Sequence, residues 1–253
     1  MKDKSWLSRS ELLIGDANLD ILMNAHVLVI GLGGVGSFAA EFLARAGIGE
    51  MTIVDGDVVD PTNRNRQLPA LATTHGQSKA LLMTERLQQI NPELKIHTIR
   101  EFINPERVAD IMDTPFDYVV EAIDSITPKI TVITTALEKK LKIVSSMGAG
   151  GKLDPTRLEV ADLADTQICK LAKYVRKRLR YKGYVSGVKA VFSREDVIKE
   201  SIILTDGSNF KKSAYGTISY LPATFGAVCA SVVIRDLIGE FEKKAEASLE
   251  QNK

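Results

Sequence analysis

The sequence predicts an α/β protein with a doubly wound, mainly parallel sheet, and three observations lead to this fold class. Short apolar runs alternate with helix-like segments as far as residue 144. A glycine-rich loop, residues 31–36, follows the first apolar run directly and precedes a helix-like segment. The chain of 253 residues is 45% hydrophobic, which is enough to bury one sizeable core of this type.

The first strand, the glycine loop and the first helix form one unit. Residues 26–30 are apolar and rich in β-branched side chains, as in a buried parallel strand. Residues 37–46 carry Phe38, Phe42 and Leu43 among alanines, which suits a helix packed on a sheet. Strand, glycine loop and helix in this order are the context that a Rossmann-like nucleotide fingerprint requires.

Four glycines predict a phosphate site in the loop. Gly31, Gly33, Gly34 and Gly36 allow backbone N–H groups to approach a phosphate, and the helix N-terminus adds partial positive charge. The second predicted strand ends at Asp55, about 20 residues further on, where a ribose hydroxyl is normally held. These features predict a bound nucleotide and leave the reaction open.

The polar segment 57–67 distinguishes the chain from a dehydrogenase. It contains a proline and is predicted to form a loop. Asn63, Arg66 and Gln67 lie in it, and polar and cationic side chains of this kind bind phosphate oxygens. Asp57 either contributes to nucleotide binding or braces this loop.

Lys79 opens a predicted helix, residues 79–90, where the helix dipole disfavours a lysine that lacks an anionic partner. It is therefore a candidate phosphate ligand, and a solvated surface lysine is the equally weighted alternative. Asp124 and Ser125 follow a predicted strand, residues 116–123, at the sheet edge where ligands bind. Asp124 is a candidate Mg²⁺ ligand, with a helix N-cap as the alternative.

This downstream set suits cleavage of ATP between its α- and β-phosphates. That reaction needs cations at the α-phosphate and a carboxylate that holds Mg²⁺, whereas hydride transfer needs neither. Arg66, Lys79 and Asp124 are accordingly the catalytic candidates. A nicotinamide-dependent oxidoreductase would leave all three unexplained, and a non-catalytic nucleotide-binding scaffold is a further alternative.

These residues resemble the adenylation domain of the ubiquitin-activating-enzyme superfamily. The shared motifs are Gly-Leu-Gly-Gly-Val-Gly-Ser (31–37) and residues 53–55, 62–67, 76–79 and 122–125. Within the superfamily, the chain resembles the family of tRNA threonylcarbamoyladenosine dehydratases, on residues 63–67, 124–129, 146–155, 162–166 and 216–222. The resemblance runs from about Arg9 to Ile238.

The resemblance implies ATP-dependent adenylation of the threonylcarbamoyl carboxylate on a tRNA adenosine, followed by ring closure with loss of AMP. The net change is a dehydration. A single ATP-binding domain, residues 1–253, would comprise an arm (1–25), a nucleotide-binding core (26–150), a tRNA-side segment (151–215) and a closing strand and helix (216–240). Asp124 would hold Mg²⁺, and the nucleotide would be bound by Gly31, Gly33, Gly34, Gly36, Asp55, Asp57, Asn63, Arg66, Gln67, Lys79, Asp124 and Ser125.

The implied partners are tRNA carrying threonylcarbamoyladenosine and a second copy of the chain, and no DNA. In the superfamily, an arginine placed like Arg9 reaches into the partner subunit's nucleotide site, as arginine fingers do elsewhere. An ordinary exposed arginine is the equal alternative. A structural monovalent cation and a cysteine-desulfurase sulfur-relay partner are left open. The main alternative function is an adenylyltransferase that activates the C-terminus of a ubiquitin-like sulfur-carrier protein.

Cysteines and histidines are few. Cys169 and Cys229 are too few for a disulfide framework or for a zinc site built from cysteine pairs, so we expect no zinc. Two cysteines fit a reducing cytoplasm. Cys169 is more readily a loop cysteine than a nucleophile, and Cys229 is expected in the core. His26, His75 and His97 are scattered singly without metal-ligand spacing, and no role is assigned to them.

A basic helix is predicted at residues 170–182, which hold seven positive charges and no acid, although the whole chain carries only +1. An apolar seam at Leu171, Val175 and Leu179 would anchor it. Such a helix suits contacts with tRNA phosphates, and a solvated amphipathic helix is the alternative. Tyr174, Tyr181 and Tyr184 would stack on bases. The candidate tRNA ligands are Lys173, Arg176, Lys177, Arg178, Arg180 and Lys182.

The C-terminal part holds an uncharged stretch, residues 213–234, that is long enough to raise the question of a membrane span. Pro222 interrupts it, so a strand at 217–221 and a buried helix at 224–237 explain it better. Residues 186–209 are expected to form a flexible substrate-side segment. The polar N-terminus has no secretory pattern, and we expect a cytoplasmic protein.

Overall fold

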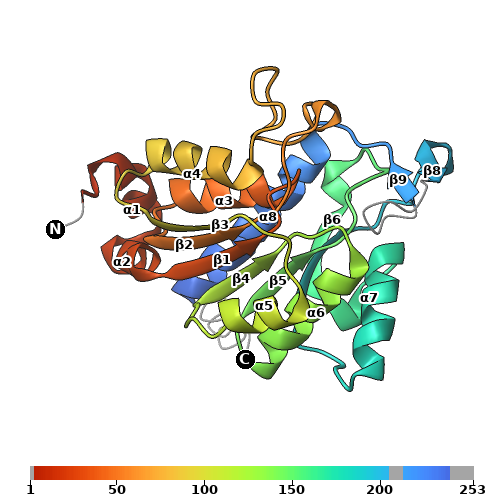
Figure 1. Cartoon of the computed structure of the whole chain (residues 1–253). Helices are drawn as coiled ribbons and strands as arrows, with labels where there is room; N and C mark the ends of the chain where they lie inside the picture. Colours follow the sequence, from red (N-terminus) through yellow and green to blue (C-terminus); the bar gives the residue numbers. More distant parts are fainter. Residues whose placement is uncertain (1–2, 205–212, 240–253) are drawn as a thin grey trace.

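The computed structural model describes residues 3–204 and 213–239. Its main sheet has seven strands in the order β3-β2-β1-β4-β5-β7-β6 (Figure 1). Neighbouring strands of this sheet run parallel, except that β6 is antiparallel to β7. The strands are β1 (His26–Ile30), β2 (Glu50–Val54), β3 (Lys95–Ile99), β4 (Tyr118–Glu121), β5 (Ile143–Ser146), β6 (Leu158–Asp162) and β7 (Lys189–Ser193).

Helices cover both faces of the main sheet (Figure 1). One layer is formed by α3, α4 and α8, and the other by α5, α6 and α7. Two more helices, α1 and α2, form an arm before β1. The bounds are α1 (Ser8–Ile14), α2 (Asp16–Asn24), α3 (Gly36–Arg45), α4 (Lys79–Ile90), α5 (Pro105–Ile111), α6 (Ile126–Glu138), α7 (Lys170–Tyr181) and α8 (Tyr220–Ile238).

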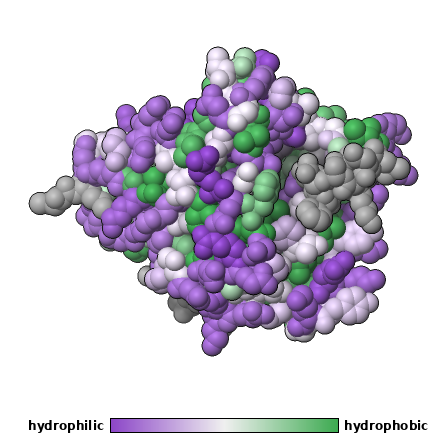
Figure 2. All heavy atoms as spheres, viewed as in Figure 1, coloured by the Kyte–Doolittle hydropathy of each residue, from purple (hydrophilic) through white to green (hydrophobic). Residues whose placement is uncertain are grey.

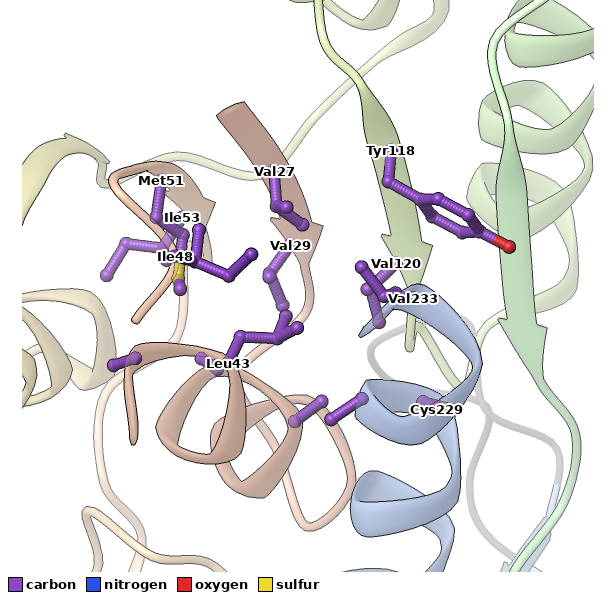
Figure 3. Packing of buried hydrophobic residues seen from close by; sticks show 14 of the residues in the cluster. Val27, Val29, Leu43, Ile48, Met51, Ile53, Tyr118, Val120, Cys229 and Val233 are labelled. Carbon is purple, nitrogen blue, oxygen red and sulfur yellow. The ribbon is translucent and has the colours of Figure 1, made fainter. Parts of the chain in front are cut away.

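The central strands are mostly apolar because both faces of the sheet are buried. Val27 and Val29 of β1 point toward α3 and α8, where they meet Leu43 and Val233 (Figure 3). The residue between them, Leu28, belongs to the second hydrophobic cluster beneath α5, α6 and α7. Two cores therefore hold the strands from opposite sides.

The strand order places a topological switch point at β1. From β1 the chain adds β2 and β3 on one side, and then crosses over to β4 and β5 on the other. Loops at the carboxyl ends of the strands diverge at such a point, and ligands bind between them. The glycine loop follows β1 and Asp124 follows β4, so both lie there. The predicted doubly wound, mainly parallel fold is confirmed.

The predicted closing strand at residues 217–221 is wrong. The strand in this region is β9 (Ser213–Tyr215), which pairs with β8 (Ile202–Leu204) in a separate two-stranded sheet. Helix α8 begins at Tyr220 instead of at residue 224 because Pro222 occupies its first turn, where the missing N–H costs nothing. The flexible segment expected at residues 186–209 is wrong for its first part, because Lys189–Ser193 form β7, a buried strand between β5 and β6. Residues 205–209 of that segment lie outside the described part of the chain.

Helix α8 is a core helix. Among the described residues it is the one helix that is long and apolar enough to cross a membrane by composition. Its residues Leu221, Phe225, Cys229 and Val233 are buried in the core cluster that α8 shares with α3 and the sheet. Figure 3 shows Cys229 and Val233 on α8. The predictions of a buried helix and of a core position for Cys229 are confirmed.

The expectation that the histidines are isolated is wrong for two of them. Strands β1, β2 and β3 are neighbours, and they bring His26 and His97 together with ring centroids 5.6 Å apart. His75 lies in an exposed loop before α4. Pairs of this kind cannot be seen in the sequence, because their spacing depends on the order of strands in the sheet.

Candidate active site

The glycine loop is shaped by two backbone constraints. Gly31 has φ = +89°, a conformation that side chains disfavour. A Cβ atom at Gly36 would lie 1.8 Å from the carbonyl oxygen of Gly31, so no other residue fits there. The loop therefore turns tightly enough to aim its backbone N–H groups, and the N-terminus of α3, at one point.

Asp55 ties the glycine loop to the loop after β2. Its Oδ2 accepts a hydrogen bond from the N–H of Leu32 at 2.6 Å, and its Oδ1 accepts one from the N–H of Asp57 at 2.7 Å. Burial raises the pKa of the Asp55 carboxyl, although the two N–H groups oppose this rise. Each carboxylate oxygen keeps a further lone pair, which can accept a hydrogen bond from a ribose hydroxyl.

Lys79 is a buried lysine with an anionic partner. Only 5% of Lys79 is exposed, and its Nζ forms an ion pair with Asp57 Oδ2 at 3.0 Å. The surface alternative for Lys79 is therefore wrong. Asp57 is half exposed, so this partner is the end of the pair that meets solvent. The pair leaves a positive charge inside the site, and its ion-pair partner Asp57 is a solvent-facing carboxylate that an incoming phosphate can replace.

Asn63 and Arg66 are held by local hydrogen bonds in and after a short 3-10 turn, η2 (Pro61–Asn63). Asn63 is buried, and its Oδ1 accepts from the N–H of Asp60 at 3.2 Å, completing a capping box. Arg66 Nη1 donates to the carbonyl of Thr62 and to Oδ1 of Asn65, both at 2.9 Å. The Asn63 side chain thus stabilises the turn. The Arg66 side chain is held in one orientation by its hydrogen bonds, and its backbone lies beside Gly34 of the glycine loop.

Gln67 lies over the glycine loop. Its Nε2 is 3.8 Å from the position of a Cβ atom on Gly33. Its Oε1 is buried and has no hydrogen-bond partner among the described residues. Buried polar atoms without a partner are rare in folded proteins, and a bound ligand commonly completes them.

Asp124 is an exposed side chain just beyond β4. The helix that follows, α6, takes Ser125 as its N-cap residue, so the N-cap interpretation of Asp124 is wrong. An exposed carboxylate beside a phosphate loop fits the oxygen ligands that Mg²⁺ requires. Asp124 therefore stays the candidate ligand for this ion.

Behind Asp124 lies a buried ion pair that was not predicted from the sequence. Glu121, the last residue of β4, and Lys129 of α6 are both fully buried and paired with each other. Glu121 Oε2 also accepts from Ser145 at 2.5 Å, and its Oε1 accepts from the N–H of Ile123 at 2.7 Å. Burial raises the pKa of Glu121, and Lys129 opposes the rise. The pair fixes the backbone that carries Asp124.

The loop after β5 contributes a further buried lysine, in addition to Lys79 and Lys129. Lys152 is 3% exposed and donates to the carbonyl of Gly148 at 2.6 Å. Burial lowers the pKa of Lys152, while Cys169 and Glu195 oppose this shift. Cys169 is a buried free cysteine at the N-cap of α7, which does not favour a role as an exposed nucleophile.

One exposed aromatic side chain near the site was also not predicted. Phe102 follows β3 and is 75% exposed. Its ring Cγ is 2.8 Å from the position of a Cβ atom on Gly56, the residue after Asp55. Phe102 therefore offers a flat apolar surface beside the carboxylate that is expected to hold the ribose.

Arg9 is exposed on α1, at the other end of the sheet from the glycine loop. The arm leads into the amino-terminal end of β1, and Leu7 packs on Gly47 in the loop before β2. The nucleotide loops, in contrast, follow the carboxyl ends of the strands. Arg9 is thus not a member of the site in its own protomer.

Helix α7 presents most, but not all, of its cations to solvent. Lys173, Lys177, Arg178, Arg180 and Lys182 are exposed, and the surface over α7 is largely hydrophilic in Figure 2. Arg176 differs, and its assignment as a tRNA ligand needs correction. Its Nη1 donates to the backbone carbonyls of Leu163 at 3.3 Å and Thr166 at 2.8 Å, and to Thr166 Oγ1 at 2.5 Å. Its guanidinium therefore serves the turn before α7.

Of the three tyrosines in this region, two are exposed and one is bonded within the protein. Tyr174 and Tyr181 are 60% and 79% exposed. Tyr184 instead donates a hydrogen bond to Glu138 Oε1 at 2.9 Å. The predicted apolar seam is confirmed, since Val175 and Leu179 are buried in the core.

Fold and site together define a doubly wound nucleotide-binding protein, with a tight glycine loop after β1 and a buried lysine, Lys79, near Asp55. The chain belongs to the ThiF family, whose model matches residues 7–252. The resemblance inferred from the motifs is confirmed.

Within this family, the chain is similar to several individual proteins. The chain is 42% identical over 246 residues to the tRNA threonylcarbamoyladenosine dehydratase of Bacillus subtilis (strain 168), covering 94% of this chain and 96% of that protein. A crystal structure of the Escherichia coli tRNA N6-threonylcarbamoyladenosine dehydratase with AMP gives a TM-score of 0.84 at 38% identity, over 94% and 96% of the two chains. The E. coli sulfur carrier protein ThiS adenylyltransferase is 31% identical over 159 residues, or 60% of this chain and 63% of that protein.

Proposed function

We propose that this chain is an ATP-dependent tRNA threonylcarbamoyladenosine dehydratase. It adenylates the carboxylate of the threonylcarbamoyl group and then releases AMP as that group closes into a ring. The observation that carries the proposal is the buried Lys79, which is paired with the half-exposed Asp57 and lies near a glycine loop that Asp55 holds in place. The relatives that match nearly the full chain support the choice of substrate.

The first step is a phosphoryl displacement. A carboxylate oxygen of the substrate attacks the α-phosphorus of ATP, the bond to the β-phosphate oxygen breaks, and pyrophosphate leaves. The product is a mixed anhydride, which is a far better electrophile than the original carboxylate. In the second step an atom of the carbamoyl group attacks the acyl carbon, and the bond to AMP breaks. One molecule of water is lost overall.

The site accelerates this chemistry by position and charge. Lys79 exchanges Asp57 for phosphate oxygens when ATP binds, and its ammonium then meets the charge that develops in the transition state. Arg66 supplies a second cation. The buried Oε1 of Gln67 accepts a hydrogen bond from a donor group of the ligand. Mg²⁺ held by Asp124 would neutralise charge on the phosphates.

The remaining parts of the proposal concern partners. The exposed cations of α7 contact tRNA phosphates, and Tyr174 and Tyr181 lie available for stacking. Two copies of the chain form a symmetric dimer in which Arg9 of one protomer enters the site of the other. The protein works in the cytoplasm, where its tRNA substrate is found.

A product assay with three substrates tests the proposal. The purified protein, ATP and Mg²⁺ are incubated with tRNA carrying threonylcarbamoyladenosine, with the same tRNA lacking the modification, or with a sulfur-carrier protein that ends in two glycines. We expect AMP and pyrophosphate only with the modified tRNA. Pyrophosphate release with the carrier protein alone, without AMP, would favour the sulfur-carrier adenylyltransferase, and release in no reaction would leave only nucleotide binding.

A further inference from the structure

A second cluster of chemically active side chains lies at the amino-terminal end of the sheet, away from the nucleotide loops. The parallel register pairs His26 of β1 with Glu50 of β2, and Thr52 of β2 with His97 of β3. Side chains at paired positions, and at positions two apart, share one face of a sheet. Three neighbouring strands therefore place two imidazoles and a carboxylate on the same face.

The distances in this cluster suit a small cation. Glu50 Oε1 is 2.8 Å from His97 Nε2 and 3.8 Å from His26 Nδ1. One ligand atom from each of the three residues lies within 4.8 Å of the other two. A tetrahedral zinc site, with bonds of about 2.0–2.2 Å, spaces its ligand atoms by about 3.3–3.5 Å. The His97 side chain is 55% exposed, so it can make the small movement that this geometry needs.

His26 is already oriented as a ligand. Its Nε2 is hydrogen-bonded to Thr52 Oγ1 at 2.9 Å, and Phe116 packs edge-on against the ring at 4.6 Å. These contacts leave Nδ1 as the nitrogen that faces Glu50, and a polar partner on the second ring nitrogen is the usual support of a metal-bound histidine.

The two carboxylate oxygens of Glu50 face different neighbours. Lys95 Nζ lies 3.8 Å from Oε2 on the solvent side, while Oε1 points to the histidines. A cation between the imidazoles would thus take Oε1 without displacing the lysine. The donor set of two imidazoles and one carboxylate is typical of zinc and related transition metals, and it is unlike the all-oxygen shells of Mg²⁺.

We propose that His26, Glu50 and His97 bind one divalent transition-metal cation of the zinc class, with water in the fourth position. The metal links the amino-terminal ends of β1, β2 and β3, which are otherwise joined only by the sheet and its core. It binds the folded chain because the three strands assemble its ligands, and it therefore stabilises the fold. This site is separate from the Mg²⁺ position at Asp124.

Metal binding to chelator-treated, nucleotide-free protein tests this proposal by calorimetry. We expect one zinc ion per chain with micromolar or tighter affinity and a raised unfolding temperature, and no such effect of Mg²⁺. The variants His97→Gln and Glu50→Gln should each weaken zinc binding by about tenfold or more. The matched control His75→Gln changes an exposed loop histidine and should bind as the unaltered chain does.

Two further readouts distinguish this site from others. Cobalt bound in place of zinc should give the intense visible absorption of a four-coordinate ion, and His97→Gln should abolish it. Asp124→Ala should keep both zinc binding and this spectrum. The proposal is overturned if zinc binds only at millimolar concentration, or if His97→Gln and Glu50→Gln bind zinc as tightly as the unaltered chain.

Discussion

At the scale of single residues, Lys79 and its partner Asp57 form the electrostatic centre of the candidate active site. Removing the ammonium takes away a cation that is buried and already in position, so the loss falls mainly on the transition state. Lys79→Met keeps most of the side-chain volume, and it leaves behind a carboxylate that is half exposed and can be hydrated. The fold should therefore tolerate the substitution.

We expect Lys79→Met to lower the rate of AMP formation by about 100-fold or more, as removal of one preorganised donor commonly does. Steady-state rates of AMP release and circular dichroism of the same preparation measure activity and folding together. The control is Lys142→Ala, which alters an exposed lysine at the opposite end of β5. Near-normal activity in Lys79→Met, with ATP still saturating, would mean that the α-phosphate lies elsewhere.

The residues that could be predicted from the sequence are those whose position depends on a strand end. Asp55 and Asp124 belong to this group, because a run of apolar residues predicts each strand and the loop follows directly. Lys79 is identified differently, as a lysine in the first turn of the helix predicted at residues 79–90. The function of Arg176 could not be predicted, since its partners Leu163 and Thr166 are set by how a separate turn packs. A basic residue in a basic helix gives no sign of being used inside the protein.

At the scale of elements, the join between β4 and α6 depends on the buried pair of Glu121 and Lys129. A buried ion pair adds little to stability compared with apolar residues, but breaking it leaves one uncompensated charge. Lys129→Met should therefore lower the free energy of unfolding by about 3–5 kcal/mol, and adding Glu121→Gln should restore much of the loss. Urea denaturation monitored by circular dichroism measures both changes. A Lys129→Met variant as stable as the unaltered protein would contradict this account.

Helix α7 provides a second prediction at this scale. Lys173 and Lys177 are exposed one turn apart, and replacing both with glutamate should weaken tRNA binding. The slope of log affinity against log salt should become shallower by about 0.7–0.9 for each phosphate that the variant no longer neutralises. Arg176→Gln should instead lower stability and leave the salt slope unchanged, because its guanidinium is bound to Thr166. Filter binding over a range of salt concentrations measures the slopes, and Lys142→Glu is the control for reversed charge.

If the double glutamate variant bound tRNA with the same salt dependence as the unaltered chain, α7 would be an ordinary solvated helix.

The elements themselves were largely predictable, as the agreement of α4 at residues 79–90 indicates. The strand expected at 217–221 failed because an uncharged run followed by proline suits a strand end and a helix start equally well. Tertiary packing of Leu221 and Phe225 decides for the helix.

At the scale of the whole molecule, the arm with Arg9 lies at the opposite end of the sheet from its own nucleotide loops. A role for Arg9 in catalysis therefore requires a second protomer. Arg9→Ala and Asp124→Ala should each be inactive, and a mixture in equal amounts should recover about a quarter of the normal activity. Half of the dimers are then mixed, and each has one intact site. The assay is AMP formation after exchange of subunits, and no recovery would exclude the role in trans.

The central claim, that the chain dehydrates threonylcarbamoyladenosine in tRNA, is tested most directly by mass spectrometry of nucleosides. Modified tRNA is incubated with the protein, ATP and Mg²⁺, digested, and compared with a reaction that contains Lys79→Met. The account predicts that the modified nucleoside loses the mass of one water molecule, in step with the release of AMP and pyrophosphate. An unchanged nucleoside, in a reaction where ATP is bound and the tRNA is intact, would contradict it.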